Sequence, residues 1–396
     1  MTFPERFAHL PDYAFPRLRA LLDTHEPGGP VLHMSIGEPR HPMPGFLAEV
    51  LAANLDGFAR YPANDGTPAL LQAISDWIAQ RYGCAVGPER LMALNGTREG
   101  LFNALLALTP EEKRGKRPVV LIPNPFYQVY AVGTLAAGAE PVYVPATAAT
   151  GHLPDYAALP DDVLARSVAA FICSPANPQG AVASEGYLTG LLELAERHDF
   201  RVFSDECYSE IWRNAPPPGL LEVAAAQGAD PERVVVFNSL SKRSNLPGLR
   251  SGFVAAGPQA MVALRRLRAY AGAPLPEPLQ AVAAAAWADE DHVRENRALY
   301  ARKYALADAI LGDVPGYTAP EAGFFLWLPA PPALGDGEAA VLELWRKTGL
   351  RALPGAYLAR DTDSGNPGAG FLRAALVAPE DQTRDGLTRL RACLYS

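Results

Sequence analysis

The sequence lacks the features that mark several large classes of protein. Its 396 residues include no apolar run of about 18 or more residues, so no membrane-spanning helix is expected. The four cysteines are far apart and form no CxxC pair, which predicts reduced thiols and neither a disulfide framework nor a metal site. The N-terminal stretch MTFPERFAHLPDY has no basic segment followed by an apolar one, so no secretory signal is expected. These absences predict a cytoplasmic protein.

An excess of basic residues is also missing. The chain has 35 Lys and Arg against 43 Asp and Glu, a net charge of −8, so nucleic acid is not expected as a partner. What the chain does have is globular composition, with 49% apolar and 20% charged residues. Its length is sufficient for two domains.

Short apolar runs alternate with helical patterns through the middle of the chain. The helical patterns cover 99–108 and 185–198, and the apolar runs predict strands at 117–123, 140–146, 167–174, 200–205, 233–239 and 252–257. Alternating strands and helices predict an α/β fold with a mostly parallel sheet flanked by helices on both faces. Ligands of such sheets bind beyond the carboxyl ends of the strands.

The pattern changes after about residue 285. A charged helical stretch at 289–312 is followed by a strand pattern (323–330), a helix pattern (338–349) and another strand pattern (371–378). We therefore predict a large cofactor-binding domain at 45–285 and a smaller α+β domain formed by 1–44 together with 286–396.

Four polar clusters follow predicted strands or open a predicted helix. They are NGTREG (95–100), SPANPQG (174–180), SDECYSEI (204–211) and SLSK (239–242). In a parallel sheet all four would meet at one edge. Alone, each has an ordinary explanation, such as a solvated loop lysine, a proline-rich turn or a helix cap. The specific signal is the ordered series.

The chemistry of this series points to pyridoxal 5′-phosphate (PLP). A helix N-terminus binds phosphate, and Ser239, Ser241 and Arg250 would add donors and positive charge. Desolvation and a neighbouring cation would favour the neutral amine of Lys242, which can form a Schiff base. A buried Asp205 needs a cationic partner, and a protonated pyridine nitrogen would be one.

On these motifs the chain resembles the fold-type I, class I/II aminotransferases over nearly its whole length. The resemblance implies that Lys242 binds PLP and moves the substrate proton, that Asp205 pairs with the ring nitrogen, and that Tyr208 and Asn177 hydrogen-bond the ring oxygen. The other residues implied to hold PLP, by its phosphate or by stacking on its ring, are Gly96, Thr97, Arg98, Tyr127, Ser239, Ser241 and Arg250.

The same resemblance implies the substrate side of the site. Arg373 would clamp the substrate α-carboxylate, with Gly37 and Asn177 beside it. Tyr61 would reach the phosphate of a neighbouring subunit, so the protein would be a homodimer with shared active sites.

Three longer stretches, 35–44, 239–253 and 353–379, are similar to the succinyldiaminopimelate aminotransferase branch of lysine and diaminopimelate synthesis. This branch implies L-glutamate as amino donor, 2-oxoglutarate as its product and N-succinyl-2-amino-6-oxopimelate as acceptor. Arg40, Arg98 and Arg243 are candidates to bind the distal carboxylate of such substrates. The motifs leave open an aminotransferase for aspartate, aromatic amino acids or acetylornithine, and a PLP-dependent C–S lyase. A regulator built on this fold is not expected, because too few residues precede 35–44 for a DNA-binding domain.

Overall fold

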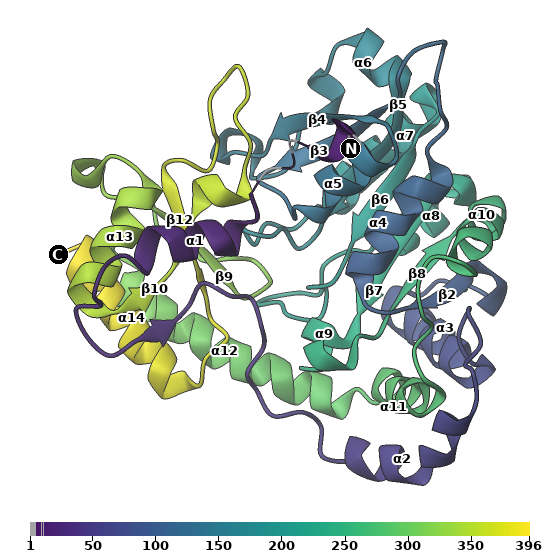
Figure 1. The fold of residues 1–396 in the computed structure, drawn as a ribbon, viewed down its shortest axis with the longest axis horizontal. Coiled ribbons are helices and arrows are strands. Elements are labelled where there is room, and N and C mark those ends of the chain that lie inside the picture. The colour runs from purple at the N-terminus through teal and green to yellow at the C-terminus, as the bar shows by residue number, and fades with distance from the viewer. Residues whose placement is uncertain (1–4, 9, 11) are drawn as a thin grey trace.

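Buried apolar side chains divide the chain into two lobes around separate cores. The computed structural model describes residues 5–8, 10 and 12–396, apart from the side chain of Arg6. In Figure 1 the larger lobe lies to the right, and the smaller lobe, which contains both the first helix and the C-terminal helix, lies to the left. The larger lobe has two apolar clusters, one on each face of its sheet, and the smaller lobe has one.

The larger lobe is built on a seven-stranded sheet of order β2-β8-β7-β6-β5-β3-β4. Its strands are β2 (Leu91–Leu94), β3 (Val119–Asn124), β4 (Glu140–Pro145), β5 (Ser167–Cys173), β6 (Arg201–Asp205), β7 (Val234–Ser239) and β8 (Gly252–Ala256). Strands β4, β3, β5, β6 and β7 run parallel, and β8 is antiparallel to both of its neighbours. The predicted α/β class with a mostly parallel sheet is therefore confirmed.

Helices cover both faces of this sheet because its strands are apolar on both sides. The lobe contains α2 (Leu47–Ala53), α3 (Pro68–Tyr82), α4 (Thr97–Leu108), α5 (Val129–Ala136), α6 (Asp161–Arg166), α7 (Glu185–His198), α8 (Leu220–Gln227), α9 (Leu240–Arg243), α10 (Pro258–Arg268) and α11 (Glu277–Ala288). Helices α4, α5 and α10 pack on one face, and α3, α7, α8 and α11 pack on the other.

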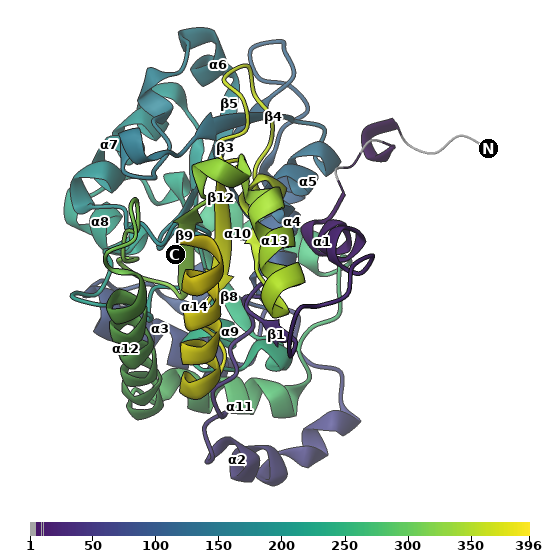
Figure 2. The same ribbon diagram turned by 90° about the vertical axis from the view of Figure 1, so that its left-hand side faces the viewer.

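The smaller lobe combines the N-terminal segment with the C-terminal third of the chain. Its elements are α1 (Ala14–Leu22), β1 (Leu32–His33), α12 (Asp291–Leu311), β9 (Phe325–Pro329), α13 (Gly337–Thr348), β10 (Leu350–Arg351), β11 (Leu353–Pro354), β12 (Phe371–Ala375) and α14 (Glu380–Leu394). Figure 2 shows α12, α13 and α14 beside the strands of this lobe. The domain limits stay a prediction, and residues 1–4, 9 and 11 of the predicted smaller domain lie outside the described residues.

The predicted elements match the observed ones closely where a pattern is long. Helix α7 has the predicted limits, and Ser184 begins it by accepting a hydrogen bond from the Tyr187 amide at 3.2 Å. The pattern missed β2, because four apolar residues give too short a run to separate a strand from a turn.

The remaining regular structure is short. Single 3-10 turns occur at Glu5–Phe7, Leu55–Ala59, Pro88–Arg90, Ala148–Thr150, Tyr156–Ala158, Pro231–Arg233, Pro247–Leu249, Pro332–Leu334 and Gly355–Leu358. In the described part of the chain no helix is long and apolar enough to cross a membrane.

Candidate active site

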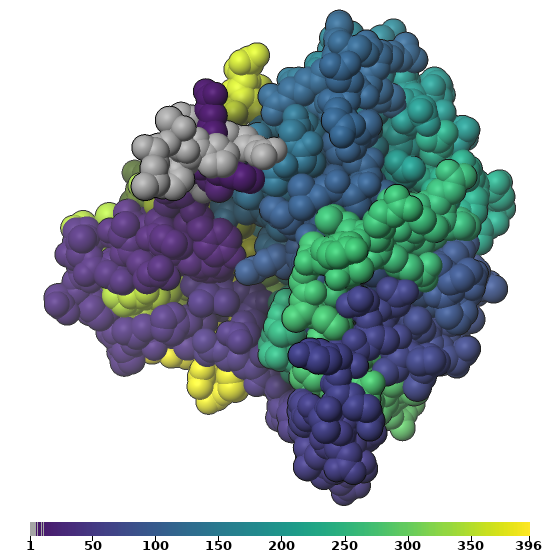
Figure 3. All heavy atoms as spheres, turned by 45° about the vertical axis from the view of Figure 1, so that its right-hand side comes forward, coloured from purple at the N-terminus to yellow at the C-terminus, as the bar shows by residue number. Residues whose placement is uncertain are grey.

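A cavity of about 260 Å³ lies where the two lobes meet. Figure 3 shows a recess between the purple N-terminal segment and the blue-to-green larger lobe. Both lobes line the cavity, and the predicted site residues among its walls are Gly37, Thr97, Arg98, Tyr127, Asn177, Asp205, Tyr208, Ser239, Ser241, Lys242, Arg250 and Arg373.

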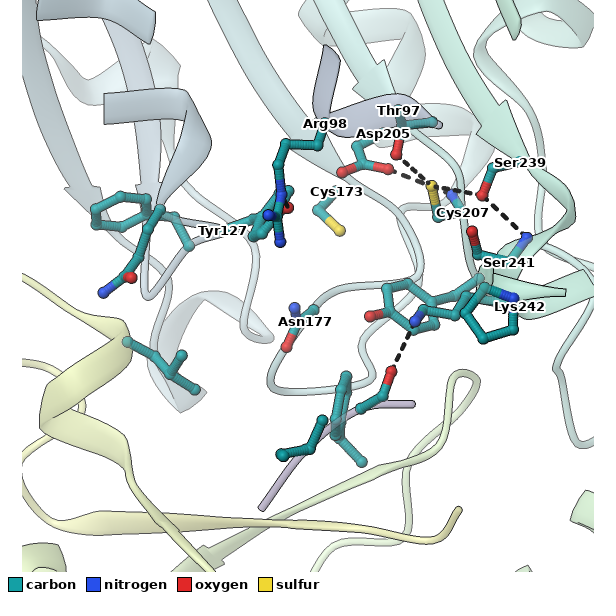
Figure 4. Close-up of a pocket in the computed structure, with 18 of the residues that line it drawn as sticks. Thr97, Arg98, Tyr127, Cys173, Asn177, Asp205, Cys207, Ser239, Ser241 and Lys242 are labelled. Carbon is teal, nitrogen blue, oxygen red and sulfur yellow. Dashed lines mark hydrogen bonds between the residues drawn. The ribbon is translucent and has the colours of Figure 1, made fainter. Parts of the chain in front are cut away.

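The carboxyl ends of neighbouring parallel strands deliver the central polar groups. Strand β6 ends at Asp205 and β7 ends at Ser239, and Asn177 lies four residues beyond the end of β5. The short helix α9 then carries Lys242 (Figure 4). Parallel strands thus place a carboxylate, a hydroxyl, an amide and an amine at one edge, as the sequence predicts.

Lys242 is a half-buried lysine that projects into the cavity. Its Nζ donates a hydrogen bond to the Gly37 carbonyl at 2.6 Å, shown dashed in Figure 4. Desolvation, together with the positive charges of Arg373 and Arg250, lowers the pKa of Lys242 to about 8, although Cys207 and Glu38 act in the opposite direction. The amine is therefore far more available as a nucleophile or base than that of an exposed lysine.

Asp205 is a buried carboxylate without an ion pair among the described residues. Its Oδ2 accepts a hydrogen bond from the Tyr130 hydroxyl at 2.7 Å, and its Oδ1 accepts one from the Cys207 amide at 3.4 Å. Burial raises the pKa of Asp205 above its usual value. A cation that enters the cavity and meets this carboxylate would favour its ionised form.

A cradle for a phosphate lies at the N-terminus of α4. Gly96 precedes the helix with φ +79°, and a Cβ placed on it would come within 2.3 Å of Arg250 Nη2. Arg250 itself donates to the Asn95 carbonyl at 3.2 Å, and Thr97 is the first residue of the helix. Free amides, hydroxyls and a guanidinium thus converge at one spot, which suits a phosphate dianion.

Arg373 is a buried guanidinium that no carboxylate neutralises within the described residues. It donates to the Asn177 Oδ1 at 2.9 Å and to the Ser35 carbonyl at 2.7 Å. Its centre lies 4.0 Å from the centroid of the Phe325 ring, and its Nε has no hydrogen-bond partner in the described part of the chain. Burial lowers the pKa of Arg373 to about 10, so the group would be stabilised by an anion.

Three predicted residues lie elsewhere. Arg243 is wrong as a candidate for the distal carboxylate, because its buried guanidinium binds Glu290 and the carbonyls of Ala286 and Trp287. Arg40 is exposed and does not line the cavity, so the structure does not place it at the site. Tyr61 is 101% exposed and also lies outside the cavity. Its contact with a partner subunit stays a prediction.

The sequence analysis missed the residues that support the predicted ones. Tyr130, which holds Asp205, lies three residues after Tyr127, and helical spacing in that segment was the available signal. Cys207 lies in the SDECY motif, and its Sγ is 3.2 Å from the Thr97 hydroxyl. Burial raises the pKa of the Cys207 thiol, so a neutral sulfur forms part of the cavity wall.

The groups present fit PLP. The unpaired Asp205 can meet a protonated ring nitrogen, the Gly96–Arg250 cradle can hold a phosphate, and Lys242 has the lowered pKa that a Schiff-base lysine requires. Fold and site together define the class of protein as a PLP-dependent enzyme of the fold-type I architecture.

Residues 30–389 match the sequence model of the family described as aminotransferase class I and II, and the chain belongs to this family of PLP-dependent enzymes. The LL-diaminopimelate aminotransferase of Desulforudis audaxviator is 35% identical, over 100% of this chain and 99% of that protein.

Two solved structures show the same likeness. The crystal structure of an aminotransferase from Neisseria meningitidis is similar with a TM-score of 0.93 and 36% identity, covering 98% of this chain and 99% of that one. A probable N-succinyldiaminopimelate aminotransferase from Thermus thermophilus has a TM-score of 0.85 and 27% identity, covering 96% and 100%.

Proposed function

We propose that this aminotransferase acts in diaminopimelate synthesis, exchanging the amino group of L-glutamate with a diaminopimelate-type substrate. The observation that carries this proposal is the buried, unneutralised Arg373, which suits an α-carboxylate, in a cavity that also contains Arg98. The similarity over the full length to a protein named LL-diaminopimelate aminotransferase supports the substrate class.

The substrate proposed from the sequence was the N-succinyl form, N-succinyl-LL-2,6-diaminopimelate. The relatives that cover the chain at 33–35% identity are named for LL-diaminopimelate itself, and the succinyl name occurs on the Thermus structure at 27% identity. We therefore widen the proposal to diaminopimelate with a free or a succinylated distal amine. Both forms present a second carboxylate at the far end of the molecule.

Lys242 is proposed to bind PLP and to move a proton between its Nζ and the substrate α-carbon. PLP, when bound, supplies an electron sink for the carbanion that this proton transfer would generate. Asp205 would hold the proton on the ring nitrogen, with Tyr130 orienting the carboxylate. Tyr208, Asn177 and Tyr127 line the cavity. We expect Tyr208 and Asn177 to hydrogen-bond polar atoms of the cofactor and Tyr127 to stack on its ring.

Arg98 is the strongest remaining candidate for the distal carboxylate. Of the three arginines proposed from the sequence, Arg98 alone lines the cavity. Its Nε donates to the Tyr127 hydroxyl at 2.8 Å, which orients the guanidinium beside another residue of the cavity wall. We expect Arg98→Ala to raise KM for the diaminopimelate substrate about tenfold and KM for alanine about twofold or less, since only the former has a distal charge.

The proposed homodimer is supported by apolar side chains that one chain leaves exposed. Met43, Leu55 and Phe58 are 56%, 52% and 55% exposed, and Tyr61 is near them in the sequence. Met43 and Leu55 line the same groove, and exposed apolar surface of this kind marks sites of protein association. Cytoplasmic location also stays a prediction.

The deciding experiment measures glutamate formed from 2-oxoglutarate by the PLP-loaded protein. LL-diaminopimelate, N-succinyl-LL-diaminopimelate, aspartate and alanine are compared as amino donors, with Lys242→Ala as the inactive control. The proposal requires that a diaminopimelate donor give the highest kcat/KM. Preference for aspartate would refute it, as would release of pyruvate and ammonia from cystathionine without amino transfer.

A further inference from the structure

A buried lysine in the smaller lobe has no carboxylate partner within the described residues. Lys303, on α12, is 2% exposed, and its Nζ lies 2.6 Å from His41 Nε2 and 3.1 Å from the Leu376 carbonyl. Desolvation lowers the pKa of Lys303 to about 7 and that of His41 to about 4. Of the two groups, the lysine thus holds the proton more strongly.

The chemistry of these groups gives the hydrogen bonds one direction. A protonated lysine has only donors, so His41 Nε2 must accept, and the ring proton must lie on Nδ1. That Nδ1 faces Asn296 Oδ1 at 2.8 Å, so it donates there. The Asn296 Nδ2 is then free to donate to the carbonyls of Lys242 at 3.3 Å and Arg243 at 3.2 Å. A chain of donors therefore runs from Lys303 to the backbone of Lys242.

The histidine also fixes the segment that touches the lysine amine. His41 is four residues after Gly37, whose carbonyl accepts from Lys242 Nζ at 2.6 Å. The Ser35 carbonyl, two residues earlier, accepts from Arg373 at 2.7 Å. The start of this segment is held by the Ala375 amide, which donates to the Met34 carbonyl at 2.7 Å. His41 holds the other end, where its ring lies 4.6 Å from that of Tyr300.

We propose that the Lys303–His41–Asn296 relay is a positioning device that sets the 35–41 backbone and the Lys242 backbone relative to each other. The relay contacts neither the Lys242 amine nor the Arg373 guanidinium directly. It acts through Gly37 and Ser35 on the carboxylate-binding side and through the carbonyl of Lys242 on the amine side. This inference rests on the proposed roles of Lys242 and Arg373.

The test uses variants that cut the relay and keep the packing. His41→Phe keeps a ring beside Tyr300 and removes both hydrogen bonds, and Lys303→Met keeps the stem and removes the amine. His33→Phe, in β1 just before this segment, and Lys347→Met, on the surface, are the matched controls. KM, kcat, PLP affinity and melting temperature are measured for each PLP-loaded protein.

We expect both relay variants to raise KM for glutamate about tenfold and to lower kcat less than about threefold, since the segment that His41 holds carries the Ser35 carbonyl that orients Arg373. PLP affinity should stay near that of the parent. The melting temperature of the relay variants should fall by a few degrees, because a buried polar group loses its partner, and the controls should match the parent. His41→Asn, whose amide can replace Nδ1 as donor to Asn296 but has no atom in the place of Nε2, should raise KM as much as Lys303→Met does. His41→Asn and Lys303→Met carry the test if His41→Phe does not fold.

Unchanged KM in His41→Phe and Lys303→Met would overturn the inference, as would a fall in melting temperature without a change in KM, because that is the mark of a purely structural role. Both results presuppose an active parent. A parent without aminotransferase activity would instead refute the proposed function, so the two failures are distinguishable.

Discussion

The two ends of the cavity are built in different ways. At one end, adjacent strands of one sheet supply Asp205 and Ser239, and the short helix α9 that follows supplies Lys242. At the other end, Arg373 is completed by Ser35 and Asn177, which are 338 and 196 residues away in the sequence. The residues of the first end are supplied by the larger lobe, whereas the second end depends on how the two lobes fit together.

The difference shows in the electrostatics as well. Among the described residues, the strand-end side contains a carboxylate without an ion pair, and the Arg373 side contains a guanidinium without one. A zwitterionic cofactor–substrate pair would satisfy both, and each unsatisfied charge is costly to keep buried without it. The comparison predicts that variants at the strand-end side act on kcat and that variants at the Arg373 side act on KM.

Removing the Lys242 amine at the strand-end side should have the largest effect on activity. Lys242→Ala should lower kcat by about 10⁴-fold or more, because both the covalent attachment and the proton transfer are lost. The visible absorbance of the PLP-loaded protein should also be lost or shifted, while glutamate still binds. A steady-state assay and an absorbance spectrum check this, and near-normal kcat would show that Lys242 has no chemical role.

Neutralising the buried carboxylate should come next. Asp205→Asn should lower kcat by about 10³-fold, since an amide cannot stabilise a protonated ring nitrogen through its charge. KM for glutamate should change little, because the substrate carboxylate binds at the other end. Tyr130→Phe is the graded control, with a smaller loss of kcat. A change in KM alone would break the proposed division of the cavity.

Changing the Arg373 guanidinium should have a smaller effect, and this effect should fall on KM more than on kcat. Arg373→Lys keeps the charge and loses the planar fork, so KM for glutamate should rise about 10²-fold while kcat falls much less. Arg346→Lys, on the surface of α13, is the control. If kcat fell and KM did not, Arg373 would belong functionally to the strand-end side.

The smallest effect is expected at the phosphate cradle. Gly96→Ala should weaken PLP affinity about tenfold, because the residue has φ +79° and its Cβ would lie 2.3 Å from the Arg250 guanidinium. Gly248→Ala, where no atom lies within 4 Å of the added Cβ, is the control. Equilibrium dialysis of PLP measures both. Equal affinities would remove Gly96 and Arg250 from the proposed cradle.

The same comparison explains what the sequence could predict. The strand-end residues follow apolar runs within a few positions, so Asp205, Ser239 and Lys242 could be predicted together from local pattern and strand direction. The partners of Arg373 could be inferred only by resemblance, since no local rule relates residues 35, 177 and 373. Arg243 was predicted wrongly because its neighbour Lys242 faces the cavity. The Arg243 side chain points the other way and binds the C-terminal end of α11 and Glu290.

If the proposed dimer forms, the fully exposed Tyr61 of one chain would complete the site of the other, and this has a genetic consequence. A chain with a defective Lys242 would still lend an intact Tyr61 to its partner, and a chain with a defective Tyr61 would still offer an intact Lys242. Two alleles that are each inactive as homodimers would then restore activity when expressed together, because one of the two sites in each mixed dimer is complete. Complementation between alleles would thus reveal which residues of one site belong to different polypeptides.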